Sequence, residues 1–133
     1  MDITLLQAES LIKKAESIAK QIGIPMNIVI LDTAGHLKYF ARMDNAFLGS
    51  IDIAMKKAKT AMLFRTNSEA VGEFLKPEIG AYGMEASNGG LMGFPGGLPI
   101  KYGEEIIGYV GVSGGPLPAD LQVAQAASNI TNL

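Results

Sequence analysis

Residues 26–43 read MNIVILDTAGHLKYFARM, and this stretch decides the fold that the sequence predicts. Its first six residues, 26–31, are almost entirely apolar, which is typical of a strand covered on both faces. Residues 32–35 (DTAG) form a turn signal, because aspartate accepts hydrogen bonds from the backbone ahead of it and glycine adopts left-handed conformations. Polar and apolar residues then alternate over 36–43, as in a strand with one wetter face. The stretch therefore predicts a β-hairpin.

Helical periodicity flanks this hairpin on both sides. Residues 4–22 carry apolar side chains at helical spacing, and a T-x-x-Q capping box opens the run at Thr4. Residues 50–64 carry a second apolar stripe, rich in alanine, which lets a helix approach a sheet closely. A further T-x-x-E box predicts a short helix over residues 66–76, ended by Pro77.

The second half of the chain is rich in glycine. Twelve of the sixteen glycines fall within residues 80–115, but large apolar side chains among them indicate an ordered loop rather than a low-complexity segment. Residues 98–102 and 105–112 predict two strands joined by a turn. Gly108 and Gly111 in the second of these strands indicate bulges or a close approach of the backbone.

A last helix is predicted from Pro116 to about Ile130. Hairpins dominate the order of elements, and strands do not alternate one for one with helices. This order predicts an α/β protein of the α+β kind, with helices packed on an antiparallel sheet rather than a doubly wound parallel sheet. The length fits a single domain over residues 1–133.

Composition narrows the classes of function. The net charge is −2, whereas a nucleic-acid-binding domain usually shows a clustered basic face. The chain has no cysteine, which excludes disulfides, zinc ribbons, iron–sulfur clusters and thiol catalysis. The first residues are amphipathic, unlike a signal peptide, and no stretch approaches the roughly 18 apolar residues of a membrane span. We therefore expect a soluble, cytoplasmic protein that binds neither nucleic acid nor a membrane.

Four segments together are distinctive. They are DTAGHL at 32–37, RMDNA at 42–46, SIDIA at 50–54 with KA at 57–58 and TA at 60–61, and GGLPI at 96–100 with Gly108 and GVSGG at 111–115. In this order and spacing they resemble the GlcG/HbpS-like family, often described as haem-degrading, and the carboxy-terminal domain of PduO proteins. Asn45 departs from the pattern, because many relatives carry glycine there.

The resemblance implies a profilin-like fold, with helices on both faces of a five-stranded antiparallel sheet. It implies a homo-oligomer. It also implies a small-molecule ligand, with haem or another tetrapyrrole as the candidate cofactor.

The segment Ser113-Gly114-Gly115 leaves a predicted strand and enters a predicted helix. Free backbone N–H groups at such a helix start attract anions, so a carboxylate, a haem propionate or a phosphate is the predicted ligand. The alternative is that the glycines only permit a tight turn. We expect Gly97 and Pro99 at the rim of the same pocket, and we expect Gly114→Val to weaken binding more than stability.

Three charged residues lie near the junction of the second strand and the second helix. Arg42 or Lys57 can hold an acidic group of a ligand. The alternative is that Asp44 caps or kinks the loop while both bases lie in solvent.

His36 is the only histidine, and haem iron often takes an axial histidine. Its place after a turn favours a solvated or loop-bracing role instead. Other conceivable iron ligands are Tyr39, Tyr82, Tyr102 and Tyr109, and the available apolar lining is Met92, Phe94 and Leu98.

No catalytic constellation or metal site is predicted. Glu78 and Glu85 flank a loop, but nothing fixes a metal-ligand spacing for them. Three classes of function stay open. The first is a protein that binds haem or another small molecule. The second is an enzyme or accessory protein acting on a small hydroxy acid, oxo acid or diol-pathway metabolite, and the third is an assembly partner without a ligand.

Overall fold

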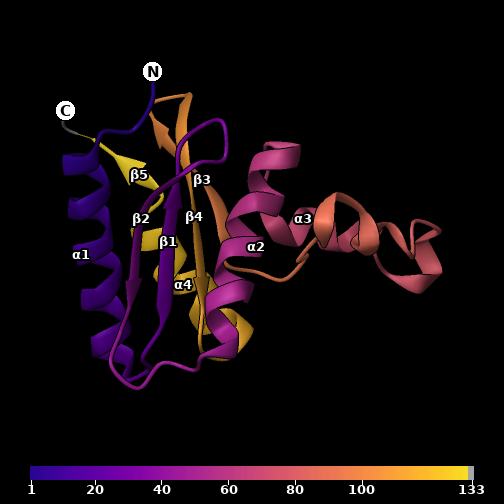
Figure 1. The fold of residues 1–133 in the computed structure, drawn as a ribbon, viewed down its shortest axis with the longest axis horizontal. Helices are drawn as coiled ribbons and strands as arrows, with labels where there is room; N and C mark the ends of the chain where they lie inside the picture. Colours follow the sequence, from indigo (N-terminus) through magenta and orange to yellow (C-terminus); the bar gives the residue numbers. More distant parts are fainter. Residues whose placement is uncertain (132–133) are drawn as a thin grey trace.

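A five-stranded sheet with the strand order β2-β1-β4-β3-β5 forms the middle layer of the molecule. The computed structural model describes residues 1–131. The strands are β1 (Asn27–Leu31), β2 (Leu37–Arg42), β3 (Gly97–Tyr102), β4 (Glu105–Ser113) and β5 (Asn129–Ile130). The helices are α1 (Leu5–Ile22), α2 (Gly49–Phe64), α3 (Ser68–Phe74) and α4 (Leu117–Ala126). Helices α1 and α4 cover one face of the sheet and α2 covers the other, as predicted (Figure 1).

The predicted hairpin is confirmed by β1 and β2, which pair antiparallel. All five residues of β1 are buried, because Ile28 and Ile30 pack toward α1 while Val29 and Leu31 pack toward α2. In the turn, one carboxylate oxygen of Asp32 accepts hydrogen bonds from the backbone N–H groups of residues 34 and 36, at 3.0 and 2.8 Å. On its other edge β1 pairs with β4, the central strand of the sheet.

The capping box of α1 is confirmed, whereas the one predicted for the next short helix is wrong. Thr4 Oγ1 accepts a hydrogen bond from Gln7 N at 3.1 Å, and Thr4 N donates one to Gln7 Oε1 at 2.9 Å. Helix α3 starts one position later than the T-x-x-E pattern requires, with Asn67 at its N-cap and no side-chain capping bond.

These two threonines give a matched pair for a stability measurement. We expect Thr4→Ala to lower the free energy of unfolding by about 1 kcal/mol, because Gln7 N loses the side-chain oxygen that caps it. Thr66→Ala is expected to change it by less than about 0.5 kcal/mol, because no cap is lost. Urea denaturation of both variants measures the difference, and equal losses would contradict this account of α1.

The end of the chain differs from the prediction. The last helix was expected to reach about Ile130, but α4 ends at Ala126 and residues 129–130 form β5. This strand pairs parallel with β3, so the sheet is antiparallel except at this edge. Residues 129–130 form a strand and not a further helical turn because the side chain of Ile130 packs into the core formed with α1 and α4.

Two glycines let α2 lie directly on the sheet. Gly97 of β3 and Gly111 of β4 are paired across the two strands, and we call them the glycine pair. A Cβ on Gly97 would collide with the backbone carbonyl of Lys57, and one on Gly111 with that of Ala54. The predicted close approach at Gly111 is thus confirmed, and the register shift beyond Ile100 confirms a bulge beside Gly108.

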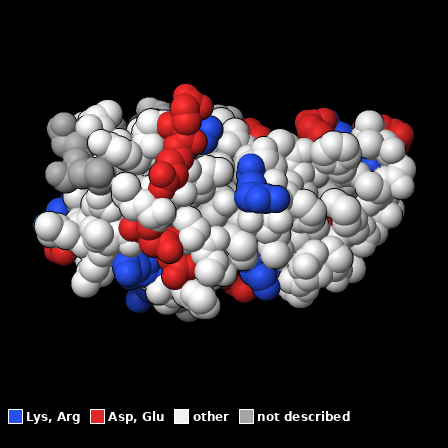
Figure 2. All heavy atoms as spheres, turned by 90° about the horizontal axis from the view of Figure 1, so that it is seen from above, with Lys and Arg blue, Asp and Glu red and all other residues white. Residues whose placement is uncertain are grey.

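Residues 68–96 form an arm that projects from the sheet beyond α2 (Figure 1). The expected helix over 66–76 is shorter than predicted, and Pro77 opens a 3₁₀ turn instead of only ending a helix. Ser68 ties the arm to the sheet, since its hydroxyl donates to Phe94 O at 2.5 Å and accepts from Gly97 N at 2.9 Å. Mostly uncharged residues form the surface of the arm on the face seen in Figure 2.

The loop before α2 accommodates the departure at Asn45. This residue has a φ of 70°, a left-handed conformation in which glycine is common and asparagine is among the few tolerated alternatives. Ala46 N donates to Met43 O at 3.1 Å and closes the turn. The left-handed conformation at this turn is therefore one that asparagine adopts.

Candidate functional site

Two neighbouring hollows share the side chain of Phe94. The inner pocket, of about 430 Å³, lies between α2 and the start of α4. It is lined by Phe47, Ser50, Ile53, Lys57, Phe94, Ser113, Gly114, Gly115, Pro116, Leu117 and Asp120. The arm groove, of about 820 Å³, lies between α3 and residues 91–95. Its larger lining side chains are Glu69, Glu73, Leu75, Lys76, Tyr82, Glu85, Leu91, Met92 and Phe94.

A buried ion pair forms one wall of the inner pocket. The ammonium Nζ of Lys57 lies 2.7 Å from Asp120 Oδ2 and donates to Val112 O at 2.9 Å. Both side chains are nearly inaccessible, at 1% and 2% exposure. Burial lowers the pKa of Lys57, and the carboxylate of Asp120 opposes this only in part. The pair therefore joins α2, β4 and α4 at one point.

Asp120 was missed by the sequence analysis. Its other oxygen, Oδ1, accepts a hydrogen bond from Gly115 N at 2.9 Å. An internal carboxylate thus stands where the sequence predicted an external anion, so a ligand anion at Gly115 would have to displace it. The available signal was an acidic residue in the first turn of a helix that follows a glycine turn.

The structure brings together only part of the predicted set. Lys57 lines the inner pocket with Ser113, Gly114 and Gly115. Its ammonium is buried against a carboxylate of the chain, so the alternative in which Lys57 lies in solvent is wrong, and its contact with a ligand stays a prediction.

The other predicted residues lie elsewhere. Gly97 lies beneath α2, and Pro99 lines a separate hollow with Arg65 and Lys101. Arg42 and Asp44 are not buried, and neither makes an ion pair within residues 1–131.

The glycine at 114 also has a packing role. A Cβ there would lie 2.6 Å from Pro25 O and 3.0 Å from Met26 Cα. Valine at this position would push against backbone atoms, which cannot give way as a flexible side chain can. Gly114→Val is therefore expected to lower stability as well, so the prediction that it weakens binding more than stability does not fit this packing.

The candidate iron ligands are spread over the molecule. The His36 side chain is 80% exposed and lies 3.2 Å from Asp32 Oδ2, which matches the loop-bracing alternative. Tyr109 is buried, and burial raises its pKa. Tyr82 lines the arm groove. Of the predicted apolar lining, Met92 and Phe94 border the groove, but Leu98 lies buried in the core.

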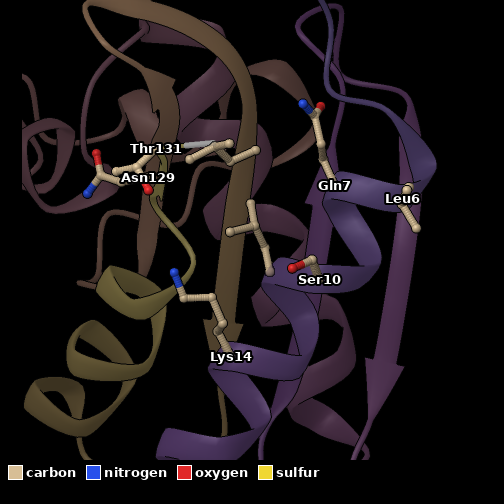
Figure 3. A pocket seen from close by; sticks show the side chains of 8 residues that line it. Leu6, Gln7, Ser10, Lys14, Asn129 and Thr131 are labelled. Carbon is tan, nitrogen blue, oxygen red and sulfur yellow. The ribbon is translucent and has the colours of Figure 1, made fainter. Parts of the chain in front are cut away.

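A further hollow, of about 320 Å³, lies between α1 and β5. Figure 3 shows Ser10 and Lys14 on the α1 side of it, with Asn129 and Thr131 across from them. Its lining residues include no aromatic side chain and no carboxylate, so it offers no stacking surface, and Lys14 is its one titratable side chain.

Two further findings concern residues 1–131 as a whole. No three His, Asp or Glu side chains gather there in a way that could hold a metal ion. No helix in that range combines the length and apolar character needed to cross a bilayer.

Comparison with known proteins gives consistent matches over nearly the whole chain. The model of the family described as haem degrading protein HbpS-like matches residues 3–129. An uncharacterised 15.0 kDa protein from the dhaT-dhaS intergenic region of Citrobacter freundii is 34% identical over 126 residues, covering 94% of this chain and 89% of that protein.

Solved structures agree in fold. The crystal structure of Klebsiella pneumoniae protein ORFY matches with a TM-score of 0.90 and 33% identity, covering 94% of this chain and 87% of the other. A crystal structure of a PduOC complex with haem matches with a TM-score of 0.89 and 30% identity, covering 96% and 93%.

Proposed function

Because the chain belongs to the HbpS-like family, we propose that it binds a haem-class ligand, and that the arm groove receives it. The observation that carries the proposal is the groove itself, with about 820 Å³ of space and walls that include Leu75, Leu91, Met92 and Phe94. Small-molecule sites are typically of this size, mostly apolar, with a few polar groups. A relative of similar fold, PduOC, has been crystallised with haem.

The groove also contains groups that fit the iron and the propionates of haem. Tyr82 is an oxygen donor of the kind that holds haem iron in some proteins, and Met92 is a sulfur donor. Lys76 is the cation in the lining, and its ammonium lies 2.9 Å from Glu73. The other charged residues of the lining are Glu69, Glu73 and Glu85, which repel carboxylates. We therefore expect the propionates to point toward solvent near Lys76.

Haemin titration followed at the Soret band tests the proposal. We expect a saturable shift for the wild-type protein, and Phe94→Ala should weaken binding about tenfold, since a large apolar wall is lost. Tyr82→Phe keeps the ring but should change the position of the band if the phenol oxygen ligates iron.

His36→Ala is the control for this titration, because that side chain is exposed and lies outside the groove lining. Loss of the shift in His36→Ala would move the site to the turn at residues 32–36. A wild-type protein without a saturable shift at tens of micromolar would contradict haem binding altogether.

The arm also carries exposed apolar side chains that can contact a second copy of the chain. Its exposed apolar side chains include Phe74, Ile79, Tyr82 and Phe94, each more than half accessible. Large exposed apolar patches of this kind usually mark contact sites. We propose that a second copy of the chain covers part of the arm and that the protein is a homo-oligomer.

Light scattering checks the assembly. We expect a mass that is a multiple of the single chain at micromolar concentration, and Ile79→Asp should shift it toward the monomer, because a charge would be buried at the contact. Leu37→Asp, at a similarly exposed position on β2, is the control. A wild-type monomer, or dissociation by the control alone, would contradict an interface on the arm.

The second candidate function is an enzyme or accessory protein for a small hydroxy acid, oxo acid or diol-pathway metabolite. The inner pocket favours it, because polar side chains of Ser50 and Ser113 meet Lys57 there. Arg42 and Asp44 no longer support it, because neither lines that pocket. Screening such metabolites for a rise in the unfolding temperature tests it.

A further inference from the structure

The inner pocket contains a primary amine that haem binding does not use. The Lys57 side chain is only 1% exposed and lines the pocket, yet lysine is among the residue types least often found inside proteins. An ammonium has three protons to donate. Val112 O and Asp120 Oδ2 accept two of them.

We propose that the inner pocket binds a small aldehyde or ketone and that Lys57 forms an imine with its carbonyl carbon. Three kinds of group meet there. Ile53 and Leu117 offer apolar contact for a short carbon chain, and the hydroxyls of Ser50 and Ser113 can donate to a carbonyl oxygen. The amine is the nucleophile, as in enzymes that use a desolvated lysine.

The reaction balances with the groups present. Asp120 takes a proton from the ammonium, and the lone pair of Nζ then forms a bond to the carbonyl carbon as the C=O π bond breaks. The carbonyl oxygen takes a proton that the attacking nitrogen loses and becomes a hydroxyl. Asp120 returns its proton to this hydroxyl, the C–O bond breaks, and water leaves. The product is a protonated imine, and no oxidant or reductant is needed.

The position of Asp120 suits both of the proton transfers in this reaction. Gly115 N holds its Oδ1, which leaves Oδ2 directed at Nζ at 2.7 Å. A protonated imine has the same charge as the ammonium it replaces, so the buried carboxylate has a cation beside it both before and after the reaction. Burial also favours a neutral amine, as the lowered pKa of Lys57 indicates.

Reductive trapping tests the proposal on the wild-type protein. The probe is propanal, at a concentration below that of the protein, with cyanoborohydride to reduce any imine, and peptide mass spectrometry to locate the label. We expect Lys57 to be labelled at least several-fold faster than Lys59, because the pocket holds the aldehyde beside a desolvated amine. Lys59 is the matched control, since it is an exposed lysine of the same helix.

Two comparisons make the result decisive. In urea the preference for Lys57 should vanish, because the pocket is gone. Asp120→Asn keeps an oxygen for Gly115 N but removes the group that carries the proton in both steps. It should therefore lower the labelling rate of Lys57 without changing that of Lys59. Labelling of Lys59 and other exposed lysines while Lys57 stays unmodified in the folded wild type would overturn the proposal, whatever the haemin titration gives.

Discussion

Lys57→Met is expected to lower the free energy of unfolding by about 3–5 kcal/mol, because it leaves a buried carboxylate without its counter-ion. Asp120 would keep only the hydrogen bond from Gly115 N, and Val112 O would lose its donor. Methionine has a similar length, so the loss reports the charge rather than a cavity. Urea denaturation measures the effect.

The double variant Lys57→Met/Asp120→Leu isolates the interaction between the two charges. It is expected to be more stable than Lys57→Met alone, because replacing both partners removes the uncompensated charge. Lys59→Met, on the exposed face of α2, serves as the control and should change stability by less than about 0.5 kcal/mol. A Lys57→Met protein as stable as this control would show that the ion pair does not hold α2 to α4.

Gly111→Ala is the second change with a large expected effect. Its Cβ would meet the carbonyl oxygen of Ala54 and the Cβ of Ala58, so α2 would have to move away from the sheet. Overpacking of a core typically costs about 1–3 kcal/mol, and contact with rigid backbone places this case at the upper end, about 3 kcal/mol.

Gly49→Ala is the matched control for the glycine pair. Gly49 lies in the first turn of α2, where an added methyl group would meet no atom within 4 Å. Alanine should raise the stability there by about 0.4–1 kcal/mol, because it restricts the unfolded chain and favours the helix. If Gly111→Ala and Gly49→Ala change the unfolding temperature alike, the backbone of α2 does not contact the sheet at Gly111 as closely as the structure indicates.

Local patterns in the sequence predicted most of the architecture. The apolar run of β1, the turn at residues 32–35 and the capping box at Thr4 each depend on neighbours a few positions apart, and each is confirmed. The short strand β5 could not be found in this way. Its two residues form a strand because Ile130 fits the core beside β3, which is a property of the whole fold.

The candidate site was predicted less completely for a related reason. Ser113, Gly114, Gly115 and Lys57 do meet, but the partner that organises them, Asp120, lies 63 residues from Lys57 in sequence. Nothing in the spacing of lysines and aspartates identifies such a pair. Gly97 was singled out as a ligand contact, whereas its lack of a side chain makes room for the backbone of α2.

The pairing of β1 with β4 has a consequence for how the molecule folds. Residues 27–31 must find residues 109–113, and α2 and the whole arm are synthesised between them. Contacts so distant along the chain slow folding, and they form late when a protein emerges from the ribosome in order. Until then the hairpin carries one unpaired apolar strand edge, which is the kind of surface that templates aggregation. Conditions that lengthen this interval should therefore reduce the yield of folded protein without changing the stability of the molecules that do fold.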